Sequence, residues 1–184
     1  MDMKLKFKIR GICYAVISDE TVEVARNRDT DSEVILPERV AYEGKNYRVT
    51  KIGIQAFYGN RALTKVFIPN SVTEIGESAF AYCTELVSVN IPEGVEKLTY
   101  ESFCGCEKLK TLVLPDSMKC VEERALWCCH SMETISIPKH LLGVEYPKIL
   151  PQRASEGGQC RGMDSLKHCL VRLPSGEIDE FDVE

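Results

Sequence analysis

The sequence has little of what most catalytic and metal-binding sites need. Its 184 residues include only three histidines and one tryptophan. Few histidines leave few positions for general-base chemistry or for imidazole ligation of a metal. The chain also has no G-x-S-x-G, no glycine-rich phosphate loop and no H-E-x-x-H motif. The sequence therefore predicts a protein that is not an enzyme and that uses no cofactor.

Long apolar runs and an excess of positive charge are missing as well. The longest unbroken apolar run covers residues 12–17, which is too short for a membrane helix or for the core of a signal peptide. The formal net charge is −5, from 23 basic and 28 acidic residues. We therefore expect no membrane insertion and no nucleic-acid partner. The 44% hydrophobic and 28% charged residues are typical of a single globular domain that buries a core.

The charges that are present differ in sign between the two ends of the chain. The first ten residues contain four basic side chains and one acidic side chain, Asp2. The last eight residues contain five acidic side chains and no basic one. We interpret the acidic tail as a solvated terminal strand, with an acidic docking tail as the alternative.

A 23-residue repeat organises the middle of the chain. Prolines recur at this interval, at Pro69, Pro92, Pro115 and Pro138. Alignment on them defines four units, 52–74, 75–97, 98–120 and 121–143. Six positions of the unit are apolar in every copy: Ile52/Ile75/Leu98/Val121, Phe57/Phe80/Phe103/Leu126, Leu63/Leu86/Leu109/Met132, Val66/Val89/Leu112/Ile135, Ile68/Ile91/Leu114/Ile137 and Val72/Val95/Met118/Leu141. A seventh position holds small residues, at Ala56, Ala79, Ser102 and Ala125.

Such a repeat predicts stacked coils. A unit of 23 residues cannot enclose a core alone, but stacking places like residues on one another as continuous apolar ridges. Residues before each proline alternate as in a strand, which points Val66 and Ile68 inward. Proline then ends the strand because it cannot donate to a ladder. The segment around Phe57 is too short for a stable helix, so we expect one helical turn with the ring inward.

The repeat resembles a known family. Its pattern, Ile-Gly-x-x-Ala-Phe-x-x-Cys-x-x-Leu-x-x-Val-x-Ile-Pro, is complete in residues 75–92 and is similar to the leucine-rich repeats of BspA-like surface antigens. Residues 34–53 also resemble the entry segment of these proteins. The resemblance implies a right-handed, curved, β-rich leucine-rich-repeat solenoid, here of four coils. It also implies a secreted or surface-attached bacterial protein that adheres to host extracellular proteins or other cells through a protein or glycan ligand.

We expect β caps at both open ends of the solenoid, within one structural unit. Residues 1–51 form the predicted N-terminal cap, with an edge strand at 4–10 and a hairpin at 12–25. Two further strands in it, 34–36 and 47–52, are expected to be joined by a turn. Residues 144–184 form the predicted C-terminal cap, with a flexible loop at 154–162 and a final hairpin over 170–183.

Nine cysteines raise the question of a metal site or a disulfide. Cys83, Cys106 and Cys129 share one repeat position, which predicts a stack of small buried side chains. The same reasoning points Cys104 outward, so four zinc ligands do not converge. Cys160 and Cys169 lie outside the repeats and could pair. An enzyme or metal protein that uses these cysteines is the least favoured of three functional hypotheses.

The favoured hypothesis is a binding surface on the outward side of the repeat strands. Leucine-rich solenoids bind partners there, because the face is rigid and its side chains are free to vary. Phe67 is the expected exposed anchor. The second hypothesis is a spacer within a longer repeat array, with no ligand of its own. The candidate binding residues form two outward rows: Lys65, Ser88, Thr111 and Thr134, and Phe67, Asn90, Val113 and Ser136.

Overall fold

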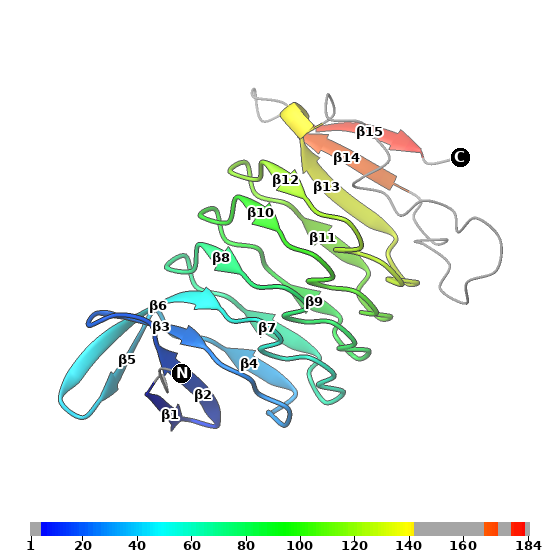
Figure 1. The fold of residues 1–184 in the computed structure, drawn as a ribbon. Coiled ribbons are helices and arrows are strands. Elements are labelled where there is room, and N and C mark those ends of the chain that lie inside the picture. The colour runs from blue at the N-terminus through cyan, green and yellow to red at the C-terminus, as the bar shows by residue number, and fades with distance from the viewer. Residues whose placement is uncertain (1–4, 142–167, 173–177, 183–184) are drawn as a thin grey trace.

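The computed structural model describes residues 5–141, 168–172 and 178–182. The chain winds into a solenoid in which successive coils lie side by side and add a short strand to each of two faces (Figure 1). Almost no helix is present in the described residues; one short 3₁₀ helix, η1, covers Lys139–Leu141. The predicted β-rich leucine-rich-repeat solenoid is therefore confirmed.

One face is an eight-stranded sheet in the order β1-β2-β3-β6-β8-β10-β12, with β5 paired to β6. The pairs β6–β8, β8–β10 and β10–β12 are parallel, as expected for neighbouring coils. The strands of this sheet are β1 (Lys6–Ile9), β2 (Ile12–Val16), β3 (Thr21–Val24), β5 (Arg39–Tyr42), β6 (Lys45–Ile52), β8 (Glu74–Ile75), β10 (Lys97–Leu98) and β12 (Cys120–Val121).

The other face carries the strands that lead to Pro37 and to the repeat prolines. It consists of β4 (Glu33–Ile35), β7 (Lys65–Phe67), β9 (Ser88–Val89), β11 (Thr111–Val113) and β13 (Thr134–Pro138). We call these five strands the strand face; β4, β7 and β9 pair in one sheet, and β11 and β13 belong to a second one. Beyond β13 the sheet continues with β14 (His168–Arg172), which is parallel to β13, and β15 (Ile178–Asp182), which is antiparallel to β14. These last two strands form the expected C-terminal antiparallel pair, while the predicted loop at 154–162 lies outside the described residues.

The core lies between the two faces and is built from the predicted apolar positions. Every residue of the six apolar rows is buried, with at most 8% of its surface exposed, and the four small residues beside the phenylalanines are buried too. Phe57, Phe80 and Phe103 stack in one row, with ring centroids 5.2 and 5.1 Å apart and ring planes within 7° of parallel. This row is the packing that the repeat predicts.

The segment that carries each phenylalanine is a series of turns rather than the expected helical turn. Successive backbone N–H groups in this segment donate alternately within their own coil and to the next coil. Ala56 N donates to Gly53 O within the coil at 3.2 Å, whereas Phe57 N donates to Ala79 O of the next coil at 2.7 Å. Gln55 has a positive φ of 55°, and its equivalents in the later units do the same. A residue in the left-handed conformation interrupts a right-handed helix. In addition, the N–H groups that donate to the next coil are not available for hydrogen bonds within a helix.

The N-terminal region contains an additional coil. The predicted hairpin is confirmed, because β2 and β3 are antiparallel, with β1 on the outside. The expected link between strands 34–36 and 47–52 is wrong, because β6 forms its hairpin with β5 and β4 lies on the strand face, parallel to β7. The strand face thus has five coils, one of which comes from the predicted cap. The sequence around Pro37 repeats the Val-x-Leu/Ile-Pro pattern at Pro69, but 32 residues away instead of 23.

Oppositely charged side chains join neighbouring coils along the outside. Among the described residues, four of these pairs link residues 23 positions apart: Lys51–Glu74 at 2.6 Å, Glu85–Lys108 at 2.6 Å, Glu96–Lys119 at 2.7 Å and Glu101–Arg124 at 3.8 Å. Each of these pairs is partly or largely exposed, so it adds little to the free energy of unfolding. The pairs match the repeat register, since each joins equivalent positions of adjacent coils.

Candidate partner-binding surface

The strand face exposes a row of apolar residues. Strand alternation turns Phe67 and Val113 outward, with 55% and 53% of their surfaces exposed, while Val66 and Leu112 beside them are buried. Lys65, Ser88 and Thr111 are also exposed, as predicted. The face is rigid because parallel ladders pair β4 with β7, β7 with β9 and β11 with β13.

Sequence reasoning missed the most exposed apolar residue of this face. Ile35 lies on β4, directly opposite Phe67 on β7, and 79% of its surface is exposed. The two side chains extend one apolar row across adjacent strands. The signal was the Val34-Ile35-Leu36-Pro37 sequence, which matches the strand pattern of the repeats. A search for units exactly 23 residues apart does not find this strand, because Pro37 lies 32 residues before Pro69.

Asn90 lies on the predicted outward row, but its amide has a structural role. Ile68 N donates to Asn90 Oδ1 at 2.8 Å, and Asn90 Nδ2 donates to Ile68 O at 2.7 Å. The backbone pairing of β7 and β9 ends at Val66 and Val89. The amide group therefore continues the ladder beyond the last backbone pair and satisfies both polar groups of a buried residue.

The predicted exposure of Ser136 is wrong, since only 6% of its surface is exposed. Thr134 is half-buried. In β13 the alternation of β7 and β11 is lost, because all of residues 135–138 are buried. Both sides of this strand are covered, so the accessible part of the strand face runs from β4 to β11.

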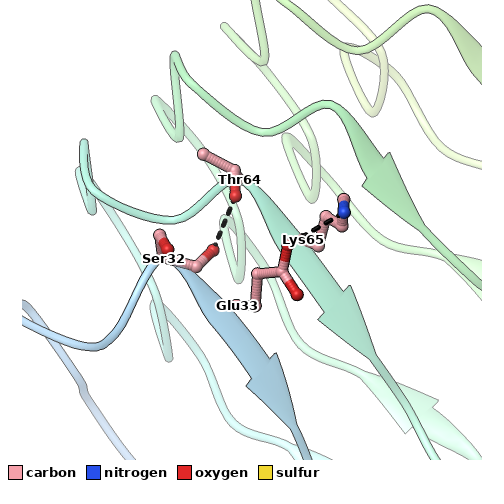
Figure 2. A network of polar contacts seen from close by, with 4 residues as sticks. All are labelled: Ser32, Glu33, Thr64 and Lys65. Atoms are coloured by element: carbon pink, nitrogen blue, oxygen red, sulfur yellow. Dashed lines mark hydrogen bonds and ion pairs between the residues drawn. The ribbon is translucent and has the colours of Figure 1, made fainter.

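An ion pair and a hydrogen bond fix β4 beside β7 at the start of the apolar row. Lys65 Nζ lies 2.8 Å from Glu33 Oε1, and Thr64 Oγ1 donates to Ser32 O at 2.8 Å. Figure 2 shows the two contacts next to each other across the two strands. Glu33 and Lys65 offset each other's charge at this end of the apolar row.

The predicted stack of buried cysteines is confirmed, and its thiols are unreactive. Cys83, Cys106 and Cys129 are fully buried, and each thiol donates to the backbone oxygen of the phenylalanine 26 residues earlier, at 3.0, 3.2 and 3.3 Å. Burial raises the pKa of Cys83 and of Cys129 to about 12, and it raises the pKa of Cys106 well above the ordinary value. The thiolate is the nucleophile and the metal ligand, so these groups are inert near neutral pH.

The outward orientation predicted for Cys104 is wrong, because only 2% of its surface is exposed. Inward–outward alternation applies to extended strands, whereas Cys104 lies in a turn segment next to Gly105, which has a φ of 71°. Within residues 5–141 and the two described C-terminal strands, no three His, Cys, Asp or Glu side chains are placed to hold a metal ion. Cys160 lies outside the described residues, so its possible pairing with Cys169 stays a prediction.

The repeated coils and their two rows of short parallel strands define a leucine-rich repeat protein, a class whose members are generally non-enzymatic scaffolds. A model of the family described as "BspA type Leucine rich repeat region" matches residues 46–146 in six copies. This match covers more than half of the sequence. The chain therefore belongs to the BspA-type leucine-rich repeat family.

Solved structures of bacterial leucine-rich repeat proteins are similar to this chain. A protein from Bacteroides ovatus is 37% identical, with a TM-score of 0.68 over 72% of this chain and 35% of that chain. A protein from Bacteroides capillosus is 28% identical, with a TM-score of 0.64 over 71% of this chain and 96% of that chain. A leucine-rich cell surface protein from Faecalibacterium prausnitzii is also 28% identical, with a TM-score of 0.64 over 75% and 38%.

The chain thus spans about a third of the length of the Bacteroides ovatus protein. Comparison with curated proteins gives no match. In the described part of the chain, every helix is too short or too polar to cross a lipid bilayer.

Proposed function

We propose that this chain is a non-catalytic module that binds a protein or glycan ligand through its strand face. The observation that carries the proposal is the apolar row formed by Ile35 and Phe67, which continues two coils later at Val113. More than half of the surface of each of these side chains is in water, so its burial by a partner is favourable. The row lies on a face held by backbone ladders, so little ordering entropy is lost on binding.

The proposed setting is a secreted or surface-attached bacterial protein that adheres to host proteins or to other cells. The Faecalibacterium prausnitzii relative is described as a cell surface protein, which supports this setting by similarity. The mechanism needs no cofactor. A ligand would displace water from the apolar row and be oriented by the polar side chains beside it, Ser88 and Thr111.

The first experiment is a binding screen of the purified chain against extracellular-matrix proteins and glycans. For any ligand found, we expect the double variant Ile35→Ser/Phe67→Ser to weaken binding by about thirtyfold or more, as for a pair of central anchor residues. A matched control is Ile17→Ser/Ile54→Ser, which removes two exposed apolar side chains outside the strand face. The control should bind normally.

Equal affinity of the Ile35→Ser/Phe67→Ser variant and the natural sequence would refute the strand face as the binding site. Thermal melting of both double variants checks that the fold is intact. A module that acts only as a spacer would give no ligand in the screen.

A further inference from the structure

At each end of the solenoid lies a strand that, among the described residues, is paired along one edge only. β1 is the terminal strand of the eight-stranded sheet, and β15 is the terminal strand of the sheet that contains β14. Figure 1 places β1 and β15 at opposite ends of the molecule. Among the described residues each of these strands is paired on one side only, so each presents a row of backbone donors and acceptors that a further strand can join.

These two edges carry opposite charge. In β1, Lys6 and Lys8 are exposed on either side of the buried Phe7, and Arg10 follows directly. The sequence of β15 is Ile-Asp-Glu-Phe-Asp, with three carboxylates and no basic residue. Two β1 edges therefore repel each other, and so do two β15 edges, whereas a β1 edge and a β15 edge attract.

We propose that β1 of one copy of this chain pairs with β15 of a second copy, so that the chains associate head to tail. Charge complementarity between these two edges favours a second copy of the chain as the partner. Because the two surfaces in contact are different, the contact is heterologous and each added copy leaves a new open edge. This proposal is independent of the strand-face function, since neither strand belongs to the strand face.

The charges have the same spacing in both strands. Lys6 and Lys8 are two residues apart with Phe7 between them, and Glu180 and Asp182 are two residues apart with Phe181 between them. A register with Phe7 opposite Phe181 therefore sets both lysines opposite carboxylate residues, whether the strands run parallel or antiparallel. No other alignment places an aromatic residue opposite an aromatic residue and both charge pairs together.

The solenoid already uses this arrangement within one chain. Lys51 on β6 is directly opposite Glu74 on β8, and the two form an ion pair. Glu33 on β4 is likewise opposite Lys65 on β7 and pairs with it. Directly opposed lysine and glutamate residues on neighbouring strands are thus compatible with the strand spacing of this fold.

The test is the molar mass of the chain in solution, measured by sedimentation equilibrium over a range of concentrations. We expect reversible growth in mass at about 0.01 M salt that is reduced at about 1 M salt, where the Debye length falls from about 30 Å to about 3 Å. The variant Lys6→Glu/Lys8→Glu should lower the association constant by roughly tenfold or more, because two attractions become repulsions. Glu180→Lys/Asp182→Lys should have the same effect.

Mixing the two reversed variants distinguishes this contact from other forms of association. Each variant alone carries the same charge on both edges, but an equimolar mixture contains complementary edges again, so its mass should rise above that of either variant. The control Arg61→Glu/Lys110→Glu changes the net charge as much as Lys6→Glu/Lys8→Glu at exposed positions away from both edges, and it should associate normally.

A chain that stays monomeric at low salt and high concentration would overturn the proposal, as would a mixture whose mass stays at that of the separate variants. Circular dichroism checks that every variant is folded. If a charge-reversed variant is not folded, Lys6→Gln/Lys8→Gln is used in its place, and a smaller decrease of the association constant is expected. An unchanged association constant in that folded variant would also refute the contact.

Discussion

Replacement of Phe80 by alanine tests the stacked core directly. Phe80 is fully buried, and it is the middle ring of the phenylalanine row, 5.2 Å from the ring of Phe57 and 5.1 Å from that of Phe103. Removal of a buried phenylalanine ring costs about 3–5 kcal/mol, from lost transfer free energy and from the cavity that remains. Two aromatic contacts are lost as well, each worth about 0.5–1.5 kcal/mol, which favours the upper part of that range.

Urea unfolding followed by circular dichroism measures this cost. A loss of about 4 kcal/mol should also lower the melting temperature by roughly 8–16 °C for a chain of this size. Phe67→Ala is the matched control, because it makes the same chemical change at an exposed position, and it should cost less than about 1 kcal/mol. A cost below about 1 kcal/mol for Phe80→Ala would refute the inward stacking.

Two further predictions concern polar groups between the coils. Asn90→Leu should reduce the free energy of unfolding by about 1–3 kcal/mol in urea titrations, because Ile68 N and O lose their partners, and an unchanged value would show that water replaces the amide. The pKa of about 12 for Cys83 and Cys129, against an ordinary value of 9.0, means that the folded chain keeps protons that the unfolded chain releases. The free energy of unfolding should therefore fall as the pH rises from about 9 towards 12. Cys83→Ala should make that fall shallower, which urea titrations at several pH values would measure. If the free energy of unfolding of Cys83→Ala and of the natural sequence fell equally steeply with pH, the raised pKa would be contradicted.

The regular part of the fold follows from the sequence because each coil repeats the environment of the previous one. A position that is apolar in all four units must lie on the same ridge, so the burial of Phe80 or Leu109 is predictable without knowledge of the rest. The same logic identifies Phe67 and Val113 as outward residues, since both lie on short strands with one buried side. It also predicts the cysteine stack.

The irregular parts could not be predicted in this way, since their positions depend on contacts outside one repeat. The outward position of Ile35 was not predicted, because nine additional residues separate its strand from the next strand of the same face. Cys104 lies in a turn, where a left-handed neighbour removes the alternation on which its orientation was based. Ser136 follows the strand pattern, but its exposure depends on what covers β13 and not on its own strand.

The hairpin of β5 and β6 shows how this fold tolerates insertions. The coil between Pro37 and Pro69 is nine residues longer than the others, yet β4 still pairs in register with β7 and β6 still pairs in register with β8. Extra chain that leaves and re-enters a coil at neighbouring points costs little loop-closure entropy. The bend between the two faces is therefore a natural graft point, where a foreign peptide or a small domain can be displayed while the scaffold keeps its packing.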